Sequence, residues 1–128
     1  MTAAVAVGMI IMGIGIAGIW TRDLLGGEAV ELSAGVFAAR EEGSGSLFWP
    51  HWIAEFTTAV FLIVGGVGLL ADAGWAATIS ALALGALLYT STNSLGWAFA
   101  QRDRFPYAVP MLLGDLVAIA GLVVLLTR

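Results

Sequence analysis

The chain has 128 residues, of which 60% are hydrophobic and only 11% are charged, and its formal net charge is −4. A soluble domain of this size needs more polar surface, so the composition argues for a protein embedded in a bilayer. The acidic balance argues against nucleic-acid binding, which depends on Lys and Arg contacts to phosphates.

Four apolar segments account for nearly all of the chain. Each approaches or exceeds the ~20 residues that cross a hydrocarbon core of about 30 Å, and only helices or closed barrels satisfy the backbone there. Continuous apolar runs lack the alternation of barrel strands. The sequence therefore predicts a single all-α domain over residues 1–128, an up-down bundle of four transmembrane helices at Ala3–Trp20, Trp49–Leu70, Ala73–Ala100 and Pro106–Thr127.

The connection between the first two segments, residues 21–48, is long enough to have structure of its own. Val30, Ala34 and Phe37 fall on one face of a helical pattern, with Glu28 toward the other side. We therefore expect a short amphipathic helix here. Its acidic face matches anionic lipid poorly, so a cap over the bundle fits at least as well as an interfacial anchor.

The other two connections are short and constrain the topology. A tight turn at residues 72–74 makes the second and third segments antiparallel neighbours. Four of the five Arg residues lie in residues 21–48 and 101–104, and the positive-inside rule places these two loops in the cytoplasm. Because Arg replaces Lys throughout, we expect a GC-rich bacterial genome and hence the bacterial cytoplasmic membrane.

Two carboxyl groups, Glu55 and Asp115, lie inside apolar segments. An ionisable group at the centre of a membrane helix costs at least ~2.5 kcal/mol and persists mainly where it faces protein or a polar cavity. His51 shares a face with Glu55, Tyr89 shares a face with Asn93, and all five residues fall in the membrane half next to the Arg-bearing loops. We predict that they form one ligand- or proton-binding pocket.

Each of these residues also has a purely structural interpretation. His51 suits an interfacial hydrogen bond, Glu55 suits a pairing with a loop Arg, and Asn93 suits a link between helices. One His and no Cys exclude the usual zinc ligand set and a haem held by two His residues of one chain. The sequence therefore predicts neither a catalytic residue nor a metal site, and it indicates no particular cofactor.

These features favour a non-enzymatic binding or accessory subunit of a membrane complex, with lipid, other membrane subunits or copies of itself as partners. A proton- or cation-coupled transporter or channel carrying charge on Glu55 and Asp115 stays an alternative, as does a quinone-binding redox subunit or membrane enzyme using His51, Tyr89 and Asp115. The scarcity of polar residues in the other membrane half counts against a channel. Four apolar helices in this length broadly resemble the DoxX-like group of small bacterial membrane proteins, a resemblance that carries over no motif or residue.

Overall fold

The computed structural model describes residues 1–26, 45–100 and 108–127. This part of the chain is all-helical, as predicted, and contains α1 (Thr2–Gly26), α3 (Gly45–Leu70), α4 (Ala76–Ala100) and α5 (Ala108–Leu126). Within it, α1, α3 and α5 are long and apolar enough to cross a membrane, whereas α4 is not among these candidates. Asn93 and the hydroxyl side chains around it lower the hydropathy of α4.

The observed helix bounds correct several predicted ones. The first helix continues past Trp20 to Gly26, and α3 begins at Gly45, so both extend into the predicted loop. Helices propagate readily beyond an apolar run once they are nucleated, because each added residue gains a backbone hydrogen bond. The third predicted helix, α4, begins at Ala76 instead of Ala73, and the described part of the last helix, α5, begins at Ala108. The predicted amphipathic helix falls largely on residues 27–44, which lie outside the described part of the chain.

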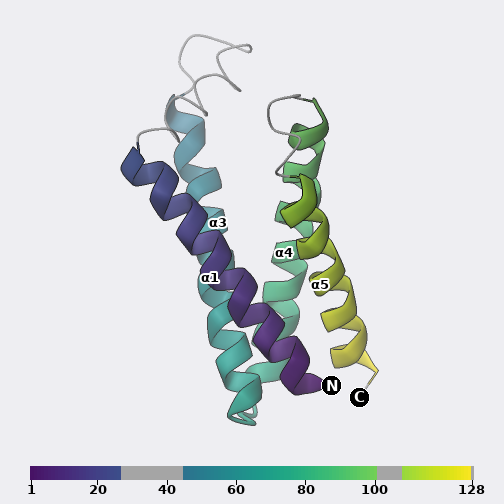
Figure 1. Cartoon of the computed structure of the whole chain (residues 1–128). Coiled ribbons are helices and arrows are strands. Elements are labelled where there is room, and N and C mark those ends of the chain that lie inside the picture. The colour runs from purple at the N-terminus through teal and green to yellow at the C-terminus, as the bar shows by residue number, and fades with distance from the viewer. Residues whose placement is uncertain (27–44, 101–107, 128) are drawn as a thin grey trace.

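Figure 1 shows that the chain runs up, down, up and down through the four helices, with both termini at the end that holds the turn after α3. The main helix pairs are α1 with α3 and α4 with α5, while α3 also contacts α4 and α1 touches α5 less extensively. The second and third apolar segments are therefore antiparallel neighbours, as the short turn between them predicted.

The turn between α3 and α4 ends α3 with a Schellman motif. The Ala73 N–H donates to the Gly68 carbonyl at 3.0 Å, and the Asp72 N–H donates to the Leu69 carbonyl at 3.4 Å. Asp72 takes the left-handed position with φ of 52°. Glycine is the usual residue there, but Asp tolerates this conformation better than most others. The carbonyl groups at the end of α3 are thus satisfied within the turn.

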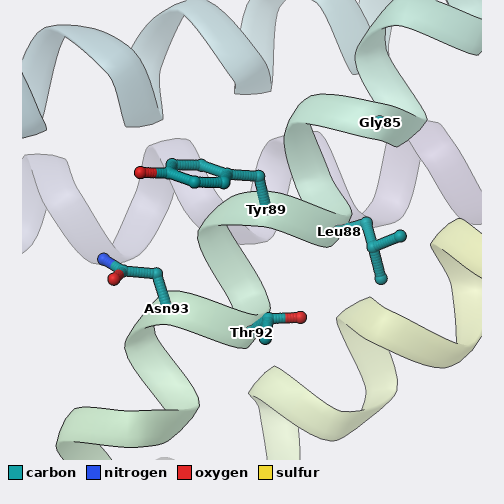
Figure 2. A pocket seen from close by; sticks show the side chains of 5 residues that line it. All are labelled: Gly85, Leu88, Tyr89, Thr92 and Asn93. Carbon is teal, nitrogen blue, oxygen red and sulfur yellow. The ribbon is translucent and has the colours of Figure 1, made fainter.

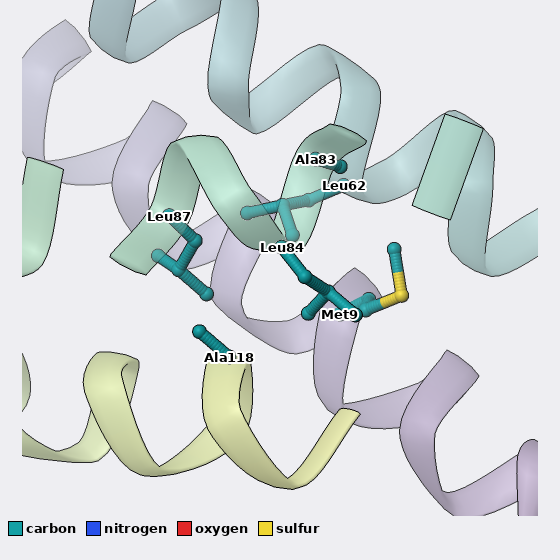
Figure 3. Close-up of a cluster of buried hydrophobic side chains, with 6 residues drawn as sticks. All are labelled: Met9, Leu62, Ala83, Leu84, Leu87 and Ala118. Carbon is teal, nitrogen blue, oxygen red and sulfur yellow. The ribbon is translucent and has the colours of Figure 1, made fainter. Parts of the chain in front are cut away.

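All four helices contribute to one hydrophobic core (Figure 3). The buried side chains at its centre are Met9, Leu62, Ala83, Leu84, Leu87 and Ala118. Three of these six belong to α4, which packs against both α3 and α5. Because α4 packs against two helices, only the side chains on its remaining face are exposed.

Glycines allow α1 and α3 to approach closely at two contact points. A Cβ atom at Gly66 would lie 2.7 Å from the Ala6 carbonyl oxygen of α1, and one at Gly13 would lie 2.7 Å from the Ala59 carbonyl oxygen of α3. Small residues drive helix association in lipid by permitting such backbone contact. Any larger side chain at these positions has to push the two helices apart.

We expect Gly66→Ala to lower the free energy of unfolding by about 1 to 3 kcal/mol, because the added methyl group meets backbone that cannot move aside cheaply. Gly18→Ala on α1 is the matched control, since its Cβ would meet nothing within 4 Å. It should change stability by no more than about 0.5 kcal/mol. Thermal unfolding of both variants in mild detergent measures this difference, and equal stability of the two would show that the α1–α3 contact is loose.

Candidate functional site

An open groove of about 410 Å³ runs along one face of α4. Its lining residues are Gly85, Leu88, Tyr89, Thr92 and Asn93 (Figure 2). Their spacing of three and four residues places them on adjacent turns of one helix face. Figure 2 shows the side chains of Tyr89 and Asn93 pointing to one side of α4 and those of Leu88 and Thr92 pointing to the other. A single helix therefore supplies the whole lining.

The polar side chains of this groove point away from the core. Tyr89 is 73% exposed, and Thr92 and Asn93 are exposed as well. An Asn amide offers two donors and a carbonyl acceptor, and a Tyr hydroxyl both donates and accepts. Within the described residues, neither Tyr89 nor Asn93 has a hydrogen-bond partner. The groove thus presents hydrogen-bonding groups that the described residues leave unused.

Asp115 of α5 reaches the groove through Thr92. The Thr92 hydroxyl Oγ1 donates to Asp115 Oδ1 at 3.3 Å, a long and therefore weak hydrogen bond. The neighbouring residue Gly114 is buried against Ser91 of α4, where a Cβ would collide with the Ser91 side chain. This close α4–α5 approach places the half-buried Asp115 beside Thr92.

Glu55 lies in different surroundings, between α3 and α1. Its side chain is only 5% exposed, and the Trp20 indole N–H donates a hydrogen bond to its carboxyl group. In the same stretch of α3 the rings of Trp52 and Phe56 pack together with centroids 4.3 Å apart. The Trp20 indole donor therefore links this buried carboxyl group of α3 to α1.

The structure brings some of the predicted site residues together and separates others. Tyr89 and Asn93 share the groove, and Asp115 joins it through Thr92, whereas the partner of Glu55 is on α1. His51 lies in α3, and its side chain is outside the described part. The groove that Tyr89 and Asn93 line faces outward from the bundle. Spacing shows which residues share a face, not where that face points, so a common ligand for all five stays a prediction.

Sequence reasoning missed two residues of this arrangement. Thr92 was not among the predicted site residues, and a loop Arg rather than Trp20 was the partner considered for Glu55. Trp20 ends the first apolar segment, and Glu55 lies just under two turns inside the second. In antiparallel helices these positions fall at similar depth, which was the signal available for this pair. The described residues contain no group of three or more His, Cys, Asp or Glu that could hold a metal ion.

The family model described as "Domain of unknown function (DUF8058)" matches residues 1–128. The chain belongs to this family. No curated protein and no solved structure matches it. The family description names no ligand or reaction, so function has to be inferred from the polar groups of α4 and their neighbours.

We expect Glu55 and Trp20 to be energetically coupled by about 1 kcal/mol in a double-mutant cycle with Glu55→Leu and Trp20→Phe, because each variant removes one partner of the same hydrogen bond. Unfolding in detergent supplies the free energies. Combining Trp20→Phe with Asp115→Asn is the control, and its two effects should add to within about 0.5 kcal/mol. Additivity in the Glu55 cycle as well would mean that the buried carboxyl group does not depend on the indole.

Proposed function

We propose that the chain is an integral membrane protein with four transmembrane helices, placed in the bacterial cytoplasmic membrane, and that it is a non-enzymatic binding or accessory subunit of a membrane complex. The observation that carries this proposal is the outward polar face of α4, where Tyr89, Thr92 and Asn93 are exposed. Three helices long and apolar enough to cross a membrane support the membrane setting.

The exposed surfaces of the other helices suit lipid. They consist largely of aliphatic side chains, among them Val7, Ile11 and Ile14 on α1, Val60, Val64 and Val67 on α3, and Leu112, Leu116 and Ile119 on α5. An unsatisfied polar group in hydrocarbon costs several kcal/mol. Asn93 would meet this cost if it faced lipid, and a protein neighbour that supplies hydrogen bonds removes it. The groove is therefore best explained as a binding face.

The composition of α4 supports the same conclusion. Its buried face contains Ser80, Thr90 and Ser91, and its exposed face contains Tyr89 and Asn93. A helix that contacts protein on both faces does not need the aliphatic side chains of a lipid-facing helix. Its lower hydropathy is then a consequence of its position inside an assembly, and α4 crosses the bilayer with the other three.

The contacts of the two carboxyl groups favour binding over conduction. Glu55 accepts from Trp20 within the α1–α3 pair, whereas Asp115 accepts from Thr92 within the α4–α5 pair. Near the N-terminal end of α4, the fully buried Ser80 hydroxyl has no hydrogen-bond partner among the described residues. A proton path needs a continuous series of hydrogen-bonded groups, and the described contacts form two separate pairs.

We expect the protein, extracted in mild detergent, to have a native mass well above that of one 13.3 kDa chain. Asn93→Leu should shift this mass toward a single chain, because it removes the amide that a partner would bind. The matched control is Leu116→Ala on the exposed aliphatic face of α5, which should leave the mass unchanged. Native mass spectrometry measures all three. A wild-type protein that runs as a single chain would contradict the proposal.

A separate prediction distinguishes binding from transport. Asp115→Asn keeps an oxygen acceptor for Thr92 but cannot titrate, so an accessory subunit should assemble equally well with either residue. Proteoliposomes loaded with a pH-sensitive dye should also show the same proton leak for wild type and variant. Proton flux through the wild type that Asp115→Asn abolishes would overturn the binding role in favour of transport.

A further inference from the structure

The exposed positions of α4 follow a regular pattern over nearly the whole helix. Among the described side chains they are Ala77, Thr78, Leu82, Gly85, Tyr89, Thr92, Asn93, Gly96 and Phe99, and we call them the α4 seam. Seven of them, beginning at Thr78 and ending at Phe99, are spaced alternately by four and three residues, and Ala77 and Asn93 lie directly beside members of this series. This mean period of 3.5 residues is that of helices packed side by side with interdigitated side chains. At 1.5 Å per residue the seam is about 30 Å long, which is the thickness of the hydrocarbon core.

The seam has room for a closely packed helix. Cβ atoms built at Gly85 and Gly96 would meet nothing within 4 Å, whereas one at Gly65 would meet the Ser80 hydroxyl at 2.8 Å. The seam glycines are thus not used for packing within the described part of the chain, unlike Gly65, and they share this openness with Gly15 and Gly18 of α1. Large side chains such as Leu82 and Tyr89 alternate with these small ones, which gives a surface of ridges and hollows.

Resting on the proposed binding function, we propose that the seam is occupied by α4 of a second copy of the chain, packed in parallel around a two-fold axis along the membrane normal. The polar groups of the seam are self-complementary. Asn93 and the Tyr89 hydroxyl each donate and accept, so identical groups facing each other across a two-fold axis form hydrogen bonds. The seam contains no Asp, Glu, Lys or Arg, so two copies meet without like-charge repulsion.

The parallel orientation follows from membrane insertion. Four of the five Arg residues lie in residues 21–48 and 101–104, and this asymmetry inserts every copy in the same sense. A two-fold axis along the membrane normal then places each seam residue opposite itself. Tyr89 and Asn93 of both copies meet at one depth, between close approaches at Gly85 and Gly96.

The Thr92–Asp115 hydrogen bond gains a role in this dimer. Because Thr92 donates its only hydroxyl proton to Asp115, its oxygen is left to accept a hydrogen bond. The Asn93 amide of the second copy is the donor that fits it. Asp115 is therefore a positioning residue that sets the hydrogen-bonding pattern of the seam without lying in it.

Single cysteines test the dimer directly, because the chain contains none. Leu82→Cys, Gly85→Cys and Gly96→Cys place thiols in the seam, and Leu116→Cys and Ile119→Cys place them on the exposed face of α5 as controls. After copper–phenanthroline oxidation in native membranes, we expect disulfide-linked chains of twice the single-chain mass at the seam positions and several-fold less at the controls. Dimer yields at the seam that do not exceed the controls would overturn the proposal.

A second substitution asks whether the polar groups hold the dimer together. In the Gly85→Cys background, Asn93→Leu should lower the dimer yield roughly three- to tenfold, the range expected for interhelical polar bonds in membranes. Asn93→Gln, which keeps the amide, should recover most of it. An unchanged yield with Asn93→Leu would overturn the role of the amide.

The outcomes also separate this inference from the proposed function. A seam cysteine that links to a chain of different mass would refute the second copy and leave the binding role intact. In membranes that contain both the Leu82→Cys and the Gly96→Cys variants, disulfides that form only between the two different variants would refute the parallel orientation. Seam variants without crosslinks, together with a native mass of one chain, would refute both.

Discussion

In the proposed membrane setting, hydrocarbon supplies no hydrogen-bond partners, so each polar group inside these helices has to find one in protein. The described contacts meet this demand locally for hydroxyls such as Thr58, which bonds to the Ala54 carbonyl of its own helix at 2.8 Å. Between helices, Trp20 meets the demand for Glu55. Tyr89 and Asn93 on the outer face of α4 remain without partners in the described part of the chain. The proposed assembly satisfies them with the same kind of contact.

Close packing of α1 on α3 makes the first of these contacts possible. With glycines at both contact points, the two helices touch through backbone and small side chains, so Trp20 in the C-terminal third of α1 lies beside Glu55. On the other side of the bundle, Gly114 allows α5 to approach Ser91 and places Asp115 next to Thr92. In both cases a small residue determines the distance between two helices, and that distance determines which polar groups meet.

The sequence was sufficient for the features that depend on length and local chemistry. Apolar runs predicted the helices, and the short turn predicted the antiparallel pair, although Asp72 rather than a glycine takes the left-handed position. Spacing placed Tyr89 and Asn93 together. It did not show that their face points outward, because α4 has polar residues on its buried face too, and the hydrophobic pattern does not orient such a helix. The partner of Glu55 depends on how two distant segments align, which local spacing does not specify.

The two carboxyl groups therefore have different explanations, although both interrupt apolar helices. Glu55 is enclosed by its own chain, and its indole partner makes it part of the α1–α3 contact. Asp115 is only half-buried and holds the hydroxyl of a residue that faces away from the core. A carboxyl group that orients a neighbour on an exposed face contributes little to the stability of one chain. In the proposed dimer it fixes Thr92 as an acceptor for the second copy, which gives α5 a reason to keep an ionisable residue within an apolar segment.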